Sequence, residues 1–131
     1  VARQANFTLP GASGHATIAR VMAELRGRSL HQVGASKVLA TCDYQQRTRT
    51  AGDKTTPLTL PSSNVLSWEL EGGSRITARP SGTEPKIKFY FECREQMAAA
   101  ESVLVARSRA QTNLDAMEKD FLAQARARGL P

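Results

Sequence analysis

The stretch "NVLSWELEGGSRITARPSGTEPKIKFYFEC", residues 64–93, decides the fold that the sequence predicts. Two strand-like runs, 64–70 and 74–79, are joined by Glu-Gly-Gly, a pattern typical of a β-hairpin. A short turn then leads into 86–93, where polar and apolar residues alternate as they do in a half-buried strand. We therefore predict three consecutive antiparallel strands, with Phe89 and Phe91 facing the core.

The turn between the last two of these strands has the composition of an anion-binding loop. Pro80 favours an extended conformation at the preceding arginine, and Gly82 lets the backbone come close to a ligand. Arginine can bind a phosphate through two parallel N–H bonds, and hydroxyl and backbone N–H groups can add further donors. The predicted phosphate site consists of Arg79, Ser81, Gly82, Thr83 and Lys88.

Two further points concern this loop. Strand alternation puts Lys86 on the same face as Lys88, which makes it a further, weaker candidate. An ordinary hairpin turn with hydrated basic side chains would give the same pattern. We find no pair of carboxylates, no Ser/His/Asp arrangement and no cluster with metal-ligand spacing, so the sequence predicts no catalytic residue and no metal site.

The rest of the chain adds helices and one further strand. Apolar residues at helical spacing predict a helix over 14–26 with Ser13 as N-cap. Residues 36–44 have the composition of a strand, and 96–128 are predicted to be helical with a break near 108–112. We expect a loose N-terminal segment over 1–12 and an exposed loop over 45–57.

These elements predict one domain over residues 1–131. Its fold class is α+β, with an antiparallel four-stranded sheet and helices packed on one face. Trp68, between two leucines, is expected in the core.

Composition limits the possible partners. The net charge of +6 is compatible with phosphorylated ligands or nucleic acid, but the arginines are dispersed and aromatic residues make up only 5%. We therefore expect no nucleic-acid partner. No apolar run is long enough to span a membrane and no signal peptide is visible, so we expect a cytoplasmic protein with two buried free thiols, Cys42 and Cys93. Because the chain begins with Val1, we expect either a processed product or, as the preferred interpretation, an excised piece of a longer protein.

The segment "RPSGTEPKIKFY", residues 79–90, resembles the phosphate-binding loop of the α-D-phosphohexomutases, the phosphoglucomutase and phosphomannomutase family. The resemblance extends to residues 60–92 and, through "PGASGHATIARVMAELRG" and "KVLATCDY", to about residues 8–95. Over these residues the chain is similar to the C-terminal, fourth domain of the larger bacterial enzymes of this family. The resemblance implies a TATA-binding-protein-like fold and assigns Arg79, Ser81, Gly82, Thr83 and Lys88 to the phosphate of a hexose phosphate.

The enzymes of this family interconvert hexose 1-phosphates and 6-phosphates, so the resemblance implies part of an isomerase that is an intramolecular phosphotransferase of carbohydrate metabolism. In the whole enzyme it implies a catalytic phosphoserine, Mg²⁺, a hexose bisphosphate intermediate and three further domains as partners. The family's catalytic-serine, metal and sugar loops have no match in these residues. We therefore expect the isolated chain to be inactive. The alternative is a stand-alone module of the same fold that binds phosphosugars or dimerises.

Overall fold

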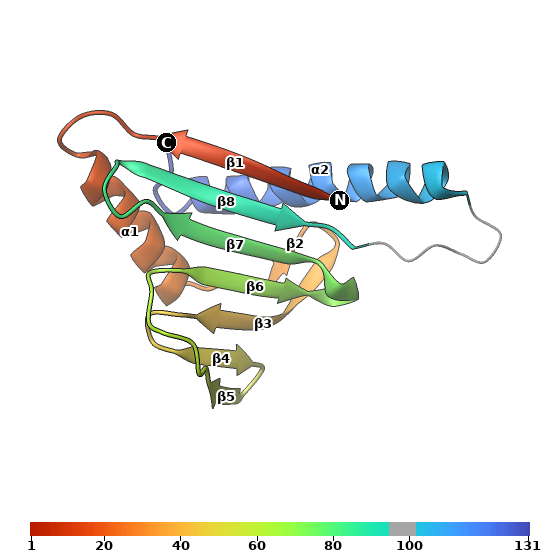
Figure 1. Cartoon of the computed structure of the whole chain (residues 1–131), viewed down its shortest axis with the longest axis horizontal. Helices are drawn as coiled ribbons and strands as arrows, with labels where there is room; N and C mark the ends of the chain where they lie inside the picture. The colour runs from red at the N-terminus through yellow and green to blue at the C-terminus, as the bar shows by residue number, and fades with distance from the viewer. Residues whose placement is uncertain (95–101) are drawn as a thin grey trace.

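The computed structural model describes residues 1–94 and 102–131 and has an α+β architecture (Figure 1). Within these residues an eight-stranded antiparallel sheet has the order β1-β8-β7-β6-β3-β4-β5, with β2 paired to β3. The strands are β1 Ala2–Thr8, β2 Gln32–Val33, β3 Ser36–Asp43, β4 Thr48–Ala51, β5 Lys54–Pro57, β6 Leu66–Leu70, β7 Arg75–Pro80 and β8 Lys86–Glu92. The helices are α1 Gly14–Gly27 and α2 Val103–Arg126, with a 3-10 turn at Glu71–Gly73. Neither α1 nor α2 is long and apolar enough to cross a membrane.

The predicted hairpin and the strand that follows it are confirmed. β6 pairs with β7 and β7 with β8, and the Glu-Gly-Gly turn joins the first two. Gly72 and Gly73 have φ of 81° and 89°, a region that residues with a Cβ rarely adopt. The predicted helix at 14–26 and the strand at 36–44 are also present, as α1 and β3.

The prediction of four strands is wrong because three further segments form strands: β1, the two-residue strand β2, and the β4–β5 hairpin. Residues 2–8, predicted to be loose, form the edge strand β1, which pairs with β8 along its whole length. Every other side chain of β1 is exposed, and on its inward face only Ala5 and Phe7 are apolar and half-buried, so the apolar alternation that marks a strand is weak.

The predicted exposed loop over 45–57 contains the β4–β5 hairpin. Its tight turn has Gly52 at φ 61°, and its strands are rich in threonine, which favours extended backbone. Pro57 has no N–H to donate and would be unfavourable in a central strand. It is tolerated here because β5 is the outermost strand of the sheet.

Helix α2 is continuous, so the predicted break at 108–112 is wrong. Small residues occupy its buried face there, Ala106 and Ala110, and the polar residues lie on the other side. Met97 and Ala100, predicted to share a face with Leu104, lie outside the described residues, and Leu104 itself is 77% exposed.

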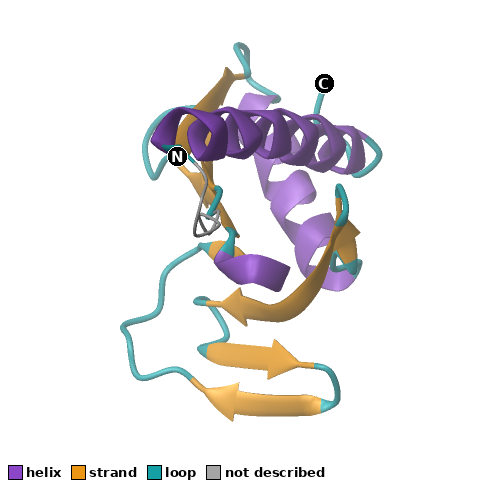
Figure 2. Ribbon diagram, turned by 90° about the vertical axis from the view of Figure 1, so that its right-hand side faces the viewer, coloured by secondary structure: helices purple, strands orange, loops and turns teal. Residues whose placement is uncertain are grey.

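Both helices pack on the same face of the sheet, as predicted, and enclose one core (Figure 2). Phe121 of α2 lies at its centre, with its ring centroid 5.4 Å from that of Trp68, 5.2 Å from Phe89 and 5.6 Å from Phe91. Trp68, Phe89 and Phe91 are fully buried, which confirms their prediction as core residues. Cys42 and Cys93 are buried and unpaired.

The face opposite the helices carries an ion pair. Arg49 of β4 donates from Nε and Nη2 to the two carboxylate oxygens of Glu69 on β6, at 3.0 and 2.9 Å. These two hydrogen bonds hold the pKa of the Glu69 carboxyl below its ordinary value of 4.5. The pair ties the outer hairpin to the centre of the sheet.

Replacing the central tryptophan should destabilise the domain strongly. Trp68→Ala removes a fully buried ring and should lower the free energy of unfolding by about 3–5 kcal/mol, measured by denaturant titration. The control Leu104→Ala truncates an exposed side chain and should change it by less than about 0.5 kcal/mol. Similar small effects for both variants would show that Trp68 is not in the core.

The Arg49–Glu69 pair should make the stability of the folded domain depend on pH in the acid range. A carboxyl whose pKa is lowered in the folded state stabilises that state above pH 4.5, and this contribution is lost as the pH falls through the folded pKa. Glu69→Gln should therefore lower the melting temperature slightly at pH 7 and less at pH 3. Because the pair is partly exposed, we expect the substitution to lower the free energy of unfolding at pH 7 by less than about 1 kcal/mol.

The control for this experiment is Glu92→Gln, which neutralises an exposed carboxylate of the same sheet. The difference in melting temperature between the unmodified chain and Glu69→Gln should shrink in acid, whereas the control should show no such trend. A difference that stays constant from pH 7 to pH 3 would contradict the role assigned to the pair.

Candidate anion-binding site

The loop between β7 and β8 is closed by its own backbone. Ser81 donates its N–H to the carbonyl oxygen of Lys86 at 2.8 Å, and Lys86 donates to the carbonyl oxygen of Glu84 at 2.7 Å. The first bond continues the strand pairing past the last pair, Pro80 with Ile87, and the second is a local bond within the turn. The loop is therefore a direct extension of the sheet and takes its position from it.

The Ser81 hydroxyl organises the tip of this loop. Its oxygen accepts hydrogen bonds from the backbone N–H groups of Thr83 at 3.3 Å and Glu84 at 3.2 Å. Two backbone donors thus point to one oxygen, which is the arrangement that a small anion uses. A hydroxyl that accepts two bonds still has its own proton to donate.

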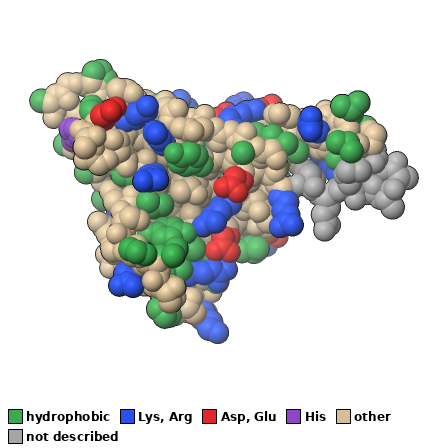
Figure 3. Space-filling view, viewed as in Figure 1, with side chains coloured by type: hydrophobic (Ala, Val, Ile, Leu, Met, Phe, Trp, Pro, Cys, Tyr) green, Lys and Arg blue, Asp and Glu red, His purple; other side chains and the backbone are tan. Residues whose placement is uncertain are grey.

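An open hollow of about 340 Å³ lies beside the loop. It is lined by Arg79, Pro80, Ser81, Gly82, Glu84, Lys86, Lys88 and Tyr90. Figure 3 shows lysine and arginine side chains on this face of the sheet, toward the end where β7 and β8 join. The structure thus brings four of the five predicted site residues to one hollow, and the fifth, Thr83, contributes its backbone N–H to the loop instead.

Strand alternation explains why these side chains meet. Ile87, Phe89 and Phe91 are fully buried under the helices, so the residues between them lie on the opposite face. Arg79 is directly opposite Lys88 in the β7–β8 pairing. Both lysines of β8 therefore lie beside the arginine of β7.

The electrostatics of the hollow favour an anion. Three of its lining side chains are cationic and one, Glu84, is anionic. Directly opposed like charges, such as Arg79 and Lys88, destabilise a sheet. Over residues 1–94 and 102–131, no carboxylate forms an ion pair with Arg79, Lys86 or Lys88. A bound dianion would offset that repulsion.

Gly82 leaves its part of the hollow open. A Cβ at this position would meet no atom within 4 Å, and its φ is not in the left-handed region. The loop conformation therefore does not require a glycine here. What the missing side chain provides is free access to the backbone.

Sequence reasoning undervalued two residues of this site. Lys86 lines the hollow equally with Lys88, and Tyr90 brings a phenol to the same surface. The signal was present, because all three share the polar face of the alternating strand.

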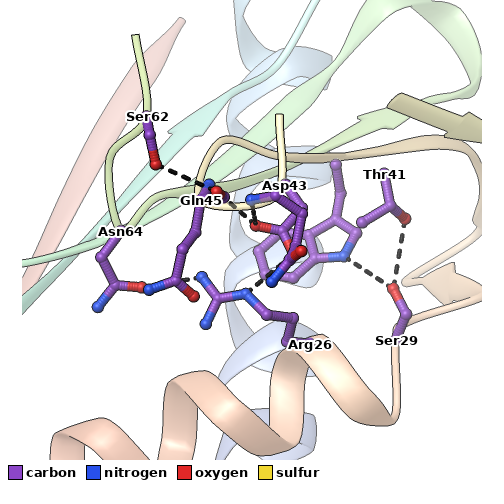
Figure 4. Close-up of polar contacts among 9 residues, drawn as sticks. Arg26, Ser29, Thr41, Asp43, Gln45, Ser62 and Asn64 are labelled. Atoms are coloured by element: carbon purple, nitrogen blue, oxygen red, sulfur yellow. Dashed lines mark hydrogen bonds and ion pairs between the residues drawn. The ribbon is translucent and has the colours of Figure 1, made fainter. Parts of the chain in front are cut away.

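The remaining polar clusters have structural roles. Asp43, 9% exposed, accepts hydrogen bonds from Nε of Arg26 at 2.9 Å and from the N–H groups of Gln45 and Gln46 (Figure 4). Nearby, Ser29 bonds to Thr41 and to the indole of Trp68. This cluster ties the end of α1 to β3 and to the turn after it. The described residues contain no group of three or more His, Cys, Asp or Glu that could hold a metal ion.

Comparison with known proteins is consistent with this geometry. Residues 52–110 match the family described as phosphoglucomutase/phosphomannomutase, C-terminal domain. The chain is 36% identical over 87 residues to a phosphoglucomutase of Staphylococcus epidermidis, covering 65% of this chain and 16% of that protein. It is 38% identical over 87 residues to a phosphoglucomutase of Staphylococcus saprophyticus (64% and 15%) and 36% identical over 77 residues to a probable phosphomannomutase of Haemophilus influenzae (59% and 13%). The chain spans less than a fifth of the length of these relatives.

The hydroxyl of Ser81 should order the loop before any ligand binds. In Ser81→Ala the N–H groups of Thr83 and Glu84 lose their acceptor, so their amide hydrogen exchange should speed up several-fold, while the melting temperature changes little because the site is exposed. The control Ser81→Thr keeps the hydroxyl and should keep the protection. Equal exchange rates in all three proteins would show that the hydroxyl does not hold the loop.

Proposed function

Since the chain belongs to the family of phosphoglucomutase and phosphomannomutase C-terminal domains, we propose that it provides the phosphate-binding site of an enzyme that interconverts hexose 1-phosphates and 6-phosphates. The observation that carries the proposal is the hollow at the β7–β8 loop, where three cations surround a hydroxyl and an open backbone. The whole enzyme is an intramolecular phosphotransferase, and this domain supplies its phosphate-binding residues. We call Arg79, Ser81, Gly82, Lys86 and Lys88 together the phosphate clamp.

Each group of the clamp has a distinct task. The Arg79 guanidinium donates two parallel N–H bonds to phosphate oxygens and so fixes the orientation of the phosphate as well as its place. Lys88 and Lys86 act as point charges from the neighbouring strand. Ser81 donates its O–H, and the missing side chain of Gly82 lets a phosphate oxygen approach the backbone.

The clamp holds a phosphate that is not being transferred. The Ser81 oxygen accepts two backbone N–H bonds and helps to order the loop, which supports a role of the hollow in positioning the sugar and not in breaking a bond. We propose that the catalytic serine, Mg²⁺ and the hexose bisphosphate intermediate belong to the three partner domains, and that the isolated chain is inactive. A TATA-binding-protein-like fold and a cytoplasmic location complete the proposal.

Amide-resolved NMR titration with glucose 6-phosphate tests the clamp, with glucose as the uncharged control. The amide signals of Arg79, Ser81, Gly82, Thr83 and Lys88 should shift with the phosphate ester and not with glucose. Arg79→Ala should weaken binding about tenfold to a hundredfold, because a hydrogen bond to a charged group contributes about 1.5–3 kcal/mol.

A matched control separates this local effect from the loss of net charge. Arg107→Ala removes the same charge from the exposed side of α2, and the start of that helix lies at the other end of the molecule from the β7–β8 loop (Figure 1). Its affinity should stay within twofold of that of the unmodified chain. Equal weakening by both substitutions would mean that the chain attracts phosphate only through its overall charge, which would refute the clamp.

A further inference from the structure

The first residue of α1 lies against the anion-binding loop. Gly14 is buried, and a Cβ placed on it would overlap the carbonyl oxygen of Leu9 and lie 2.9 Å from the Cβ of Pro85. Real Cβ atoms essentially never come this close to another atom. Because the φ of Gly14 is not in the left-handed region, the glycine is needed for space and not for backbone conformation.

Leu9 and Pro85 are themselves joined. The N–H of Leu9 donates to the carbonyl oxygen of Pro85 at 2.8 Å, one residue beyond the last β1–β8 pair, Thr8 with Lys86. Leu9 is 9% exposed and belongs to the core. We call the contact of Leu9, Gly14 and Pro85 the loop seam; Figure 1 shows the start of α1 beside the β7–β8 turn.

The loop seam is rigidly connected to the hollow. Pro85 directly precedes Lys86, whose N–H bonds to Glu84 and whose carbonyl oxygen accepts the N–H of Ser81. A displacement of Pro85 therefore moves Lys86 and Ser81, both of which line the hollow. Gly14 is not among the residues that line the hollow.

We propose that Gly14 is a positioning residue of the phosphate clamp: its missing side chain lets α1 close against Leu9 and Pro85, and this contact sets the position of the anion-binding loop. The proposal rests on the function proposed above. It assigns to the start of α1 a role in ligand binding that acts only through the loop seam.

Helix α1 provides its own control. Gly27 is the last residue of the helix, and a Cβ there would meet no atom within 4 Å. Gly27→Ala and Gly14→Ala therefore make the same chemical change at opposite ends of one helix, and only the second intrudes on the loop seam. Any general effect of alanine on helix stability should appear in Gly27→Ala as well.

The test compares the two variants of the full chain with the unmodified protein by amide-resolved NMR, first free and then titrated with inorganic phosphate. In free Gly14→Ala the amide signals of Ser81, Glu84 and Lys86 should move, while those of Phe89 and Phe121 in the core stay in place. Its affinity for phosphate should fall at least tenfold. Gly27→Ala should keep the loop signals and the affinity, with an unchanged or raised melting temperature.

The outcomes for the two proposals are separable. Unmoved loop signals in free Gly14→Ala would overturn the positioning role, whatever the chain binds. Failure of the unmodified chain to bind phosphate would contradict the proposed function, while the loop signals of the free variants would still decide whether Gly14 positions the loop.

A measurement on the unmodified chain covers the case in which Gly14→Ala does not fold. The loop seam requires the Leu9 amide to be hydrogen-bonded and enclosed, so its hydrogen exchange should be as slow as that of the Phe89 amide in β8. Exchange of the Leu9 amide as fast as that of the exposed loop residue Gly82 would show that the seam is open, and would overturn the proposal.

Discussion

The alternation of side chains along β8 is the constraint on which both the core and the candidate site depend. Burial of Ile87, Phe89 and Phe91 against the helices places Lys86 and Lys88 on the other face. A shift of one residue in the pairing would expose the three apolar side chains and bury the lysines. The ring contacts of Phe121 with Phe89 and Phe91 therefore fix the register that places both lysines beside Arg79.

The parts of the fold with strong apolar periodicity could be predicted from the sequence, namely the central hairpin, β8, α1 and the buried half of α2. The strands that were missed, such as β1 and the β4–β5 hairpin, form through backbone pairing with a neighbour and bury few side chains. Such pairing depends on neighbouring strands and is difficult to predict from the local sequence alone. The break predicted in α2 failed for a related reason, since Ala106 and Ala110 fit a close approach to the sheet without a strong apolar signal.

The candidate site was predictable in composition but not in all its contacts. The turn residues and the alternation of β8 indicated an anion site, and the structure brings Arg79, Ser81, Gly82 and Lys88 to one hollow. The contact of Gly14 with Pro85 joins segments about seventy residues apart, which no local pattern reveals. In the proposed arrangement the site is thus built by a hairpin and aligned by a distant helix.

On the proposed function, this hollow binds the dianionic form of a phosphate ester. A phosphate monoester gains its second charge near pH 6, whereas lysine and arginine stay protonated through this range. The most direct measurement is the dissociation constant of glucose 6-phosphate at pH 5 and at pH 8, followed through the amide signals of Ser81 and Gly82. Binding should be several-fold tighter at pH 8, and the same loop signals should move at both pH values. Equal or weaker binding at pH 8, or shifts confined to other parts of the chain, would show that the hollow does not bind the dianion.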